Sequence, residues 1–148
     1  MRISAKGRYA LAALIQIANK SSATEPIPII SISEAMGVSK LFLEQIAAEL
    51  KKGGLITAVK GAKGGYQLAR GPSEITAMDV LKSVENTLFE TARNEPLEQA
   101  PVVFAALSEL VFAPLDKAVE KCLSGITLND LLDYTMEHDG SQSFMLYI

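Results

Sequence analysis

The stretch SISEAMGVSKLFLEQIAAELKKGG, Ser31–Gly54, decides the fold. Its second half repeats apolar residues at the spacing of one helical face and then reaches two glycines, which predicts a helix over residues 40–52. Ser39 stands at the N-cap position, where a serine hydroxyl can accept from a backbone N–H of the first turn. Because the outer face of this helix is polar, we expect that face to be open to a partner.

A very short helix precedes it. The spacing of Ser31 and Glu34 resembles a capping box, and Gly37 ends the segment. Gly37 is expected to supply the positive φ of a tight turn, and Val38 to pack inward. Ser33 stands where such turns usually carry alanine, and it is small enough to pack. The two helices and their turn predict a helix-turn-helix.

The flanking segments extend this motif. RYALAALIQIAN predicts a helix on the N-terminal side that begins near Ser4. On the other side, the β-type runs LITAVK and GYQLAR flank a glycine-rich turn and predict an antiparallel hairpin. A helix, a helix-turn-helix and a hairpin in this order are typical of a winged helix-turn-helix. We therefore expect a mainly α fold with a small β-hairpin.

The glycine-rich turn, Gly61–Gly65, allows a second interpretation, because glycine beside lysine also cradles nucleotide phosphates. The turn matches neither the P-loop pattern nor the dinucleotide fingerprint, and a strand follows it instead of a helix. We therefore expect a hairpin tip whose glycines let Lys60 and Lys63 approach DNA. An ordinary turn with solvated lysines is the remaining alternative.

The charge of the chain is divided unevenly. The formal net charge is −3, but residues 1–70 hold ten basic and four acidic residues, a net +6, and residues 71–148 hold four and thirteen, a net −9. A basic half joined to an acidic half indicates a polyanion-binding module fused to a second unit. Chance clustering of charges on solvated faces is the alternative.

The second half has its own helical pattern. ITAMDVLKSVENTL begins with a capping-box spacing, residues 102–123 are helical in period with Pro114 expected to kink or divide them, and ITLNDLLDYTM predicts a last short helix. We expect three units: a winged-helix DNA-binding domain (1–71), a helical region (72–135), to which the family resemblance described below assigns dimerisation, and a tail (136–148).

The composition excludes several classes of protein. One cysteine, Cys122, and one histidine, His138, leave no catalytic constellation and no multi-cysteine metal site, so we expect no enzyme, cofactor or metal. Cys122 falls on the apolar side of a predicted helix, which favours a buried structural thiol over a redox sensor. No apolar run approaches the ~20 residues of a membrane span, and no secretory h-region opens the chain. A cytoplasmic location, away from membranes, is expected.

The exposed side of helix 40–52 is the predicted reading surface. Gln45 can pair with an adenine edge, and Leu41 or Phe42 can touch a thymine methyl. Core packing of Phe42 is an equal alternative, and Glu44 fits either a contact to cytosine or an ion pair along the helix. The full predicted DNA-binding set is Arg8, Ser39, Lys40, Leu41, Phe42, Gln45, Lys52, Lys60 and Lys63.

Four segments carry a resemblance to a known family: MRISAKGRYALAAL, VSKLFLEQIAAELKKGGLITAVKGAKGGYQLAR, ITAMDVLKSVE and ITLNDLLDYT. They resemble the Rrf-type family of bacterial transcriptional regulators over nearly the whole chain, most specifically in LEQ and GGY. The resemblance implies a homodimer joined by a long C-terminal helix, with each recognition helix and wing reading half of a palindrome in double-stranded DNA. The reading positions that it implies are Ser39, Leu41, Phe42 and Gln45, with Lys60 on the wing.

The chain departs from the cluster-binding members of that family, which carry three cysteines before the long helix. Residues 86–110 contain none, and the single thiol of Cys122 cannot hold a cluster that needs several ligands. The resemblance therefore implies a cluster-free member, nearest in character to the cysteine metabolism repressor. The tail FMLYI resembles the end of that branch, which implies docking of Tyr147 and Ile148 on cysteine synthase. A tail packed on its own dimer is the alternative.

These observations predict a dimeric DNA-binding regulator that acts as a repressor. A protein-interaction module, with the winged helix bound to a protein partner instead of DNA, is the second hypothesis. The net +6 of residues 1–70 favours DNA.

Overall fold

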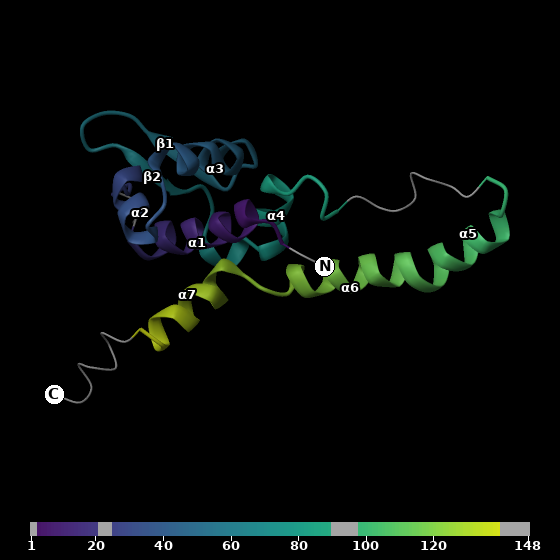
Figure 1. Ribbon diagram of the computed structural model, residues 1–148. Helices are drawn as coiled ribbons and strands as arrows, with labels where there is room; N and C mark the ends of the chain where they lie inside the picture. The colour runs from purple at the N-terminus through teal and green to yellow at the C-terminus, as the bar shows by residue number, and fades with distance from the viewer. Residues whose placement is uncertain (1–2, 21–24, 90–97, 140–148) are drawn as a thin grey trace.

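Figure 1 shows the computed structural model of the chain, in which residues 3–20, 25–89 and 98–139 are described. The N-terminal elements are α1 (Ala5–Lys20), α2 (Ile29–Met36), α3 (Lys40–Lys52), β1 (Ile56–Val59), β2 (Gly65–Leu68), η1 (Pro72–Glu74) and α4 (Ala77–Val84). They are followed by α5 (Pro101–Leu107), η3 (Ser108–Phe112), α6 (Ala113–Ser124) and α7 (Leu128–Glu137). The predicted fold class, mainly α with one antiparallel hairpin, is confirmed.

An aliphatic core holds the N-terminal unit together. Leu14 and Ile17 of α1 and Ile46 and Leu50 of α3 belong to one cluster and are at most 2 % exposed. Burial of each such side chain stabilises the fold by about 1.5–3 kcal/mol. The cluster also takes in residues from beyond the hairpin, namely Ile75, Val80, Val84 and Leu128. The segments around α4 and α7 therefore share the core of the winged helix, and the division of the chain into units at residues 71 and 135 stays a prediction.

In the helix-turn-helix, α3 has the predicted bounds, whereas α2 begins earlier than predicted. Ser39 Oγ accepts the N–H of Phe42 at 3.1 Å, and Gly37 adopts φ 66° at the end of α2. The predicted capping box between Ser31 and Glu34 is wrong, because α2 begins at Ile29 with Pro28 as its N-cap. Pro28 offers a pre-set φ of −62°, and its carbonyl accepts the N–H of Ser31 at 3.1 Å, so Ser31 lies inside the helix.

The hairpin pairs with a third segment that precedes α2. Within the hairpin, Ile56 lies opposite Leu68 and Val59 opposite Gly65. Ile27 then bonds to Tyr66 in both directions, N–H to carbonyl, at 2.9 and 2.8 Å. Gly65 permits this approach: its φ is 153°, and a Cβ there would lie 2.1 Å from the Ile27 carbonyl oxygen. The wing is thus fixed to the segment that enters the helix-turn-helix.

Two copies of the pattern I-T-x-x-D, at Ile75–Asp79 and Ile126–Asp130, join the end of the chain to the winged helix. In each, the threonine hydroxyl accepts the aspartate N–H and the aspartate carboxylate accepts the threonine N–H. The two caps also pair with each other, since the Ala77 N–H bonds to Ile126 O and the Leu128 N–H to Ile75 O, both at 2.8 Å. The N-termini of α4 and α7 are therefore tied together.

One long helical run, α5–η3–α6, extends away from the winged-helix body (Figure 1). The expected interruption at Pro114 is present as the π-helical segment η3, whose last turn closes with an Ala113 N–H bond to Ser108 O. Because Pro114 has no N–H to donate, one wider turn absorbs the missing bond and the run continues.

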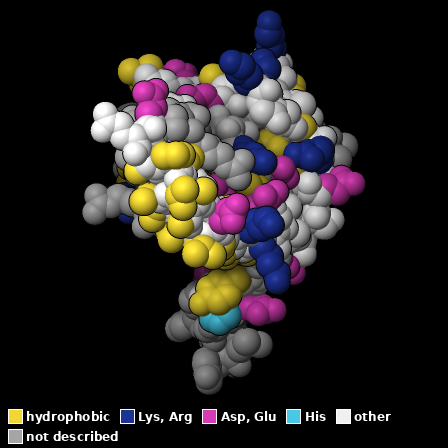
Figure 2. Space-filling model, turned by 90° about the vertical axis from the view of Figure 1, so that its right-hand side faces the viewer, with side chains coloured by type: hydrophobic (Ala, Val, Ile, Leu, Met, Phe, Trp, Pro, Cys, Tyr) yellow, Lys and Arg dark blue, Asp and Glu magenta, His cyan; other side chains and the backbone are white. Residues whose placement is uncertain are grey.

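The apolar face of this run is uncovered in the single chain. Figure 2, which looks from the α5 end, shows hydrophobic side chains gathered there. The exposed members are Val102, Val103, Leu107, Leu110, Val111 and Leu115. The prediction that Cys122 is buried is wrong for the single chain: the thiol is free and exposed. Periodicity correctly located an apolar face, but nothing in the described part of this chain covers it.

Candidate nucleic-acid interface

The outer face of α3 presents the predicted reading side chains to solvent. Lys40, Leu41 and Gln45 are all exposed, with Leu41 67 % accessible. An α-helix fits the major groove of DNA, which is about 12 Å wide, and offers its N-terminal residues to base edges. Leu41 is a large apolar side chain that no described part of the chain covers, which suits contact with a thymine methyl.

Two contacts with α1 hold α3 in place beneath that face. The ring of Phe42 meets Tyr9 edge-on at a centroid distance of 5.5 Å, and Glu49 is ion-paired with Lys6. Phe42 is partly buried and packs against the core, as the second interpretation of this residue predicted. Its first role is therefore to fix the angle of α3.

Glu44 forms the predicted ion pair along the helix, 3.8 Å from Lys40. Both side chains are about half exposed, so the pair contributes little to stability. Because the pair is weak, Lys40 can exchange this carboxylate for a phosphate at little cost in free energy.

Ser33, the departure from alanine in the turn, is compensated. It is buried, and its hydroxyl donates to the Val38 carbonyl at 2.6 Å. This hydrogen bond satisfies the buried hydroxyl and fixes the turn that sets α2 against α3. Val38 packs on the core as predicted.

The wing brings a second basic surface close to the start of α3. Lys60 and Lys63 are exposed on the loop between β1 and β2. A hollow of about 360 Å³ separates this loop from α2 and α3, and Lys40, Val59 and Gly65 line it. The structure thus brings Lys40 together with the wing on one side of the molecule.

Two predicted residues lie apart from that cluster. Lys52 is at the far end of α3, where it lines a different hollow, and Arg8 is exposed on α1, the helix beneath α3. Among the described residues, no acidic group is ion-paired with Arg8, Lys52, Lys60 or Lys63. These four charges are free to neutralise phosphates. Tyr147 and Ile148 lie outside the described residues.

Sequence reasoning missed Ile30. It is 50 % exposed at the start of α2 and lines the hollow beside the wing. The apolar pair Ile29-Ile30 after a proline was the available signal, because only one of two neighbouring helical residues can face the core. Ile30 therefore adds an exposed apolar side chain to the surface between α2 and the wing.

This geometry defines a winged helix-turn-helix with an exposed reading helix and a basic wing. The chain belongs to the Rrf2 family, whose description is "Iron-dependent Transcriptional regulator" and which matches residues 3–134. It is a DNA-binding transcriptional regulator and not an enzyme.

Individual relatives support the same class. The chain is 36 % identical to the HTH-type transcriptional regulator CymR of Bacillus subtilis over 149 residues, covering all of both chains. It is 34 % identical to the regulator IscR of Photorhabdus laumondii over 90 % of this chain and 80 % of that one. The solved structure titled as CymR, the global cysteine regulator of B. subtilis, has a TM-score of 0.70 and covers 91 % of this chain and 98 % of that one.

The family's description mentions iron, but this chain lacks the cysteines that would hold an iron–sulphur cluster. Iron–sulphur clusters are held mainly by several cysteine thiolates, and this chain has one cysteine in total. Among residues 3–20, 25–89 and 98–139, no group of three His, Cys, Asp or Glu side chains is placed to hold a metal ion.

Within those same ranges, none of the helices has the length and apolar character that crossing a membrane requires.

Proposed function

We propose that the protein is a homodimeric transcriptional repressor that reads a palindromic operator with residues 39–52 and the wing, residues 55–70. The observation that carries the proposal is the exposed face of α3 with Leu41 and Gln45 beside a wing whose lysines have no acidic ion-pair partner among the described residues. In this arrangement Gln45 reads a base edge, and Lys60 and Lys63 neutralise phosphates.

Dimerisation would account for the uncovered face of α5–η3–α6. Six large apolar side chains on one helical run are more than a monomer usually exposes in one place, and Leu110 is 77 % accessible. An isologous pairing of two such runs would bury them and set two reading helices in a two-fold arrangement. Two-fold symmetry of the protein requires a palindromic operator.

The proposal is tested by binding to the DNA upstream of the protein's own coding sequence. In an electrophoretic mobility assay, the protein should retard this DNA in preference to a shuffled duplex of equal length, and transcription from it should fall when protein is added. Equal retardation of both duplexes would leave only non-specific binding, and retardation of neither would favour the protein-interaction module.

We infer that the protein controls genes of cysteine metabolism. We also infer that it acts in the cytoplasm. The relative titled as a global cysteine regulator matches this chain over nearly its whole length. We extend the proposal to cysteine synthase as a partner, with Tyr147 and Ile148 as the docking end.

Immobilised full-length protein should then retain purified cysteine synthase, and protein that ends at residue 146 should not. The shortened protein should still bind DNA, which controls for folding. Equal retention by both forms would remove the tail from the interface.

A further inference from the structure

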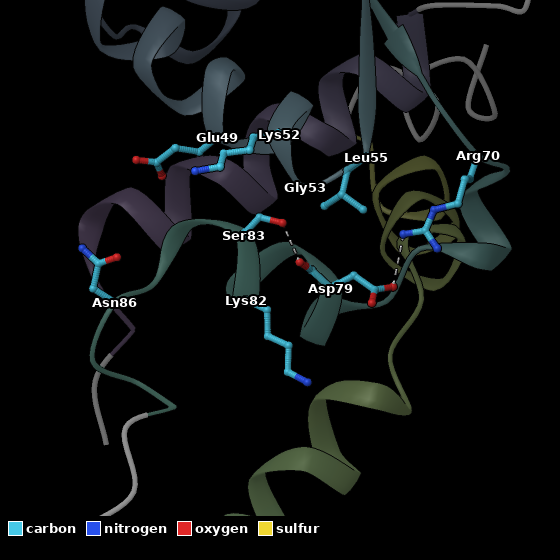
Figure 3. A pocket seen from close by; sticks show the side chains of 9 residues that line it. All are labelled: Glu49, Lys52, Gly53, Leu55, Arg70, Asp79, Lys82, Ser83 and Asn86. Carbon is cyan, nitrogen blue, oxygen red and sulfur yellow. Dashed lines mark hydrogen bonds and ion pairs between the residues drawn. The ribbon is translucent and has the colours of Figure 1, made fainter. Parts of the chain in front are cut away.

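A second hollow lies at the C-terminal end of α3, beside the base of the wing and apart from its tip. It measures about 540 Å³ and forms where the end of α3, the chain after β2 and helix α4 meet (Figure 3). This volume lies in the range of small-molecule sites in proteins. Its charged and amide side chains are Glu49 and Lys52 of α3, Arg70 after β2, and Asp79, Lys82 and Asn86 on or just after α4.

The charge in this hollow is unbalanced toward the positive. Glu49 is ion-paired with Lys6 of α1, and Asp79 lies 3.7 Å from Arg70 while also accepting the Thr76 N–H at 3.0 Å. Glu49 Oε1 and the Asp79 carboxylate are therefore ion-paired, whereas Glu49 Oε2 is buried without a hydrogen-bond partner among the described residues. In the described part of the chain no acidic side chain is ion-paired with Lys52 or Lys82. The hollow is thus lined by three basic side chains, Lys52, Arg70 and Lys82, and two acidic ones, Glu49 and Asp79.

We propose that this hollow binds a small organic anion that carries two acidic groups, carboxylate or phosphate. Figure 3 shows the Lys52 side chain directed to the side of Glu49 and the Lys82 side chain directed away from the other labelled side chains, so one acidic group does not satisfy both. A diacid places one group on each ammonium, and the amide of Asn86 offers a further donor. Arg70 stays paired with Asp79.

The hollow lies at the contact between the reading helix and the rest of the molecule. α3 packs against α4 so closely that a Cβ on Gly53 would lie 2.2 Å from Ser83 Oγ, and α4 in turn contacts α6. An anion bound to both Lys52 and Lys82 fixes α3 relative to α4. It therefore changes DNA affinity, and DNA changes anion affinity by the same factor. This coupling rests on the proposed DNA-binding function; anion binding itself does not.

The test is isothermal titration calorimetry of the full-length protein, without DNA, using citrate, succinate and inorganic phosphate at constant ionic strength. Citrate or succinate should bind saturably and more tightly than inorganic phosphate, because only the diacids reach both ammoniums. Lys82→Gln should weaken this binding about tenfold, and Lys82→Arg should retain it. The matched control is Lys20→Gln, which removes the same charge from the last turn of α1 and should leave binding unchanged.

Three results would overturn the proposal. The first is the absence of saturable binding of any of the three anions to a folded wild-type protein. The second is equal weakening of anion binding by Lys82→Gln and Lys20→Gln. The third is a loss of DNA affinity in Lys82→Gln, measured without citrate, that is as large as the loss of citrate affinity in that variant. The last result would assign the hollow to a phosphate of the DNA backbone. If the protein binds citrate but no DNA, the anion site stands and the proposed function fails.

Discussion

At the scale of single residues, Gly65 does most to place the wing. It brings the hairpin within hydrogen-bonding distance of Ile27, and so ties the wing to the entry of the helix-turn-helix. Gly37 is a useful contrast: it has φ 66°, but a Cβ there would meet nothing within 4 Å.

Gly65→Ala should therefore destabilise the protein more than Gly37→Ala. The first change adds a collision with backbone to an unfavourable φ, at a cost of about 2–4 kcal/mol, whereas the second adds only the strain of a left-handed backbone, about 1–2 kcal/mol. Urea unfolding of both variants measures the difference. Equal midpoints would show that the Ile27–Tyr66 pairing does not hold the wing.

Gln45 is the residue that we propose to read a base edge. Gln45→Ala should lower the preference for operator over shuffled DNA by roughly 1–3 kcal/mol while leaving affinity for the shuffled duplex unchanged, because the change removes a base contact and no charge. Competition binding measures both quantities. The control is Gln99→Ala, an exposed glutamine before α5. An unchanged preference in Gln45→Ala would remove this residue from the reading surface.

At the scale of elements, the paired I-T-x-x-D caps anchor α7 to α4. The Thr127 N–H and hydroxyl lower the pKa of Asp130 below its ordinary value of 3.8. Because the folded-state pKa lies below the unfolded one, this cap stabilises the fold fully above the unfolded pKa, and the stabilisation is lost as pH falls through the folded pKa.

The stability difference between wild type and Asp130→Asn should therefore be constant near neutral pH and shrink below about pH 4. Thermal unfolding from pH 7 to pH 2.5 measures it. A difference that persists unchanged to the lowest pH would show that the Asp130 charge does not contribute to the cap.

The sequence predicts those elements best whose signals are local. The bounds of α3 follow from the apolar spacing, Ser39 and the glycines that follow Lys52, and all of these act within a few residues. The start of α2 was misplaced because Pro28 could end one segment or begin the next, and only its packing decides between them.

Contacts between residues that lie far apart in the sequence are harder to predict from it. Nothing near Ile27 in the sequence indicates that it pairs with Tyr66, and the two I-T-x-x-D caps are 51 positions apart (Ile75 and Ile126). The exposure of Cys122 was missed for a different reason. Periodicity shows which face of a helix is apolar, but it does not show whether the same chain covers that face.

At the scale of the whole molecule, the exposed run α5–η3–α6 should be a subunit interface. Leu110→Glu should shift the protein from dimer to monomer in sedimentation equilibrium, because it places two charges in the buried pairing. Met136→Glu, on α7, introduces the same charge at another exposed apolar site, and it should stay dimeric. A Leu110→Glu protein that remains dimeric would move the interface elsewhere.

The proposed function depends above all on binding of duplex DNA by the basic wing and the exposed face of α3. The most direct measurement is the salt dependence of binding to the upstream DNA by fluorescence anisotropy. Affinity should fall steeply between about 50 and 200 mM salt, and the double change Lys60→Gln with Lys63→Gln should lower the slope of log affinity against log salt by about 2 per subunit. Lys117→Gln with Lys121→Gln, on α6, should leave the slope unchanged. An affinity that is flat with salt, or equal slopes for the two double variants, would contradict the account.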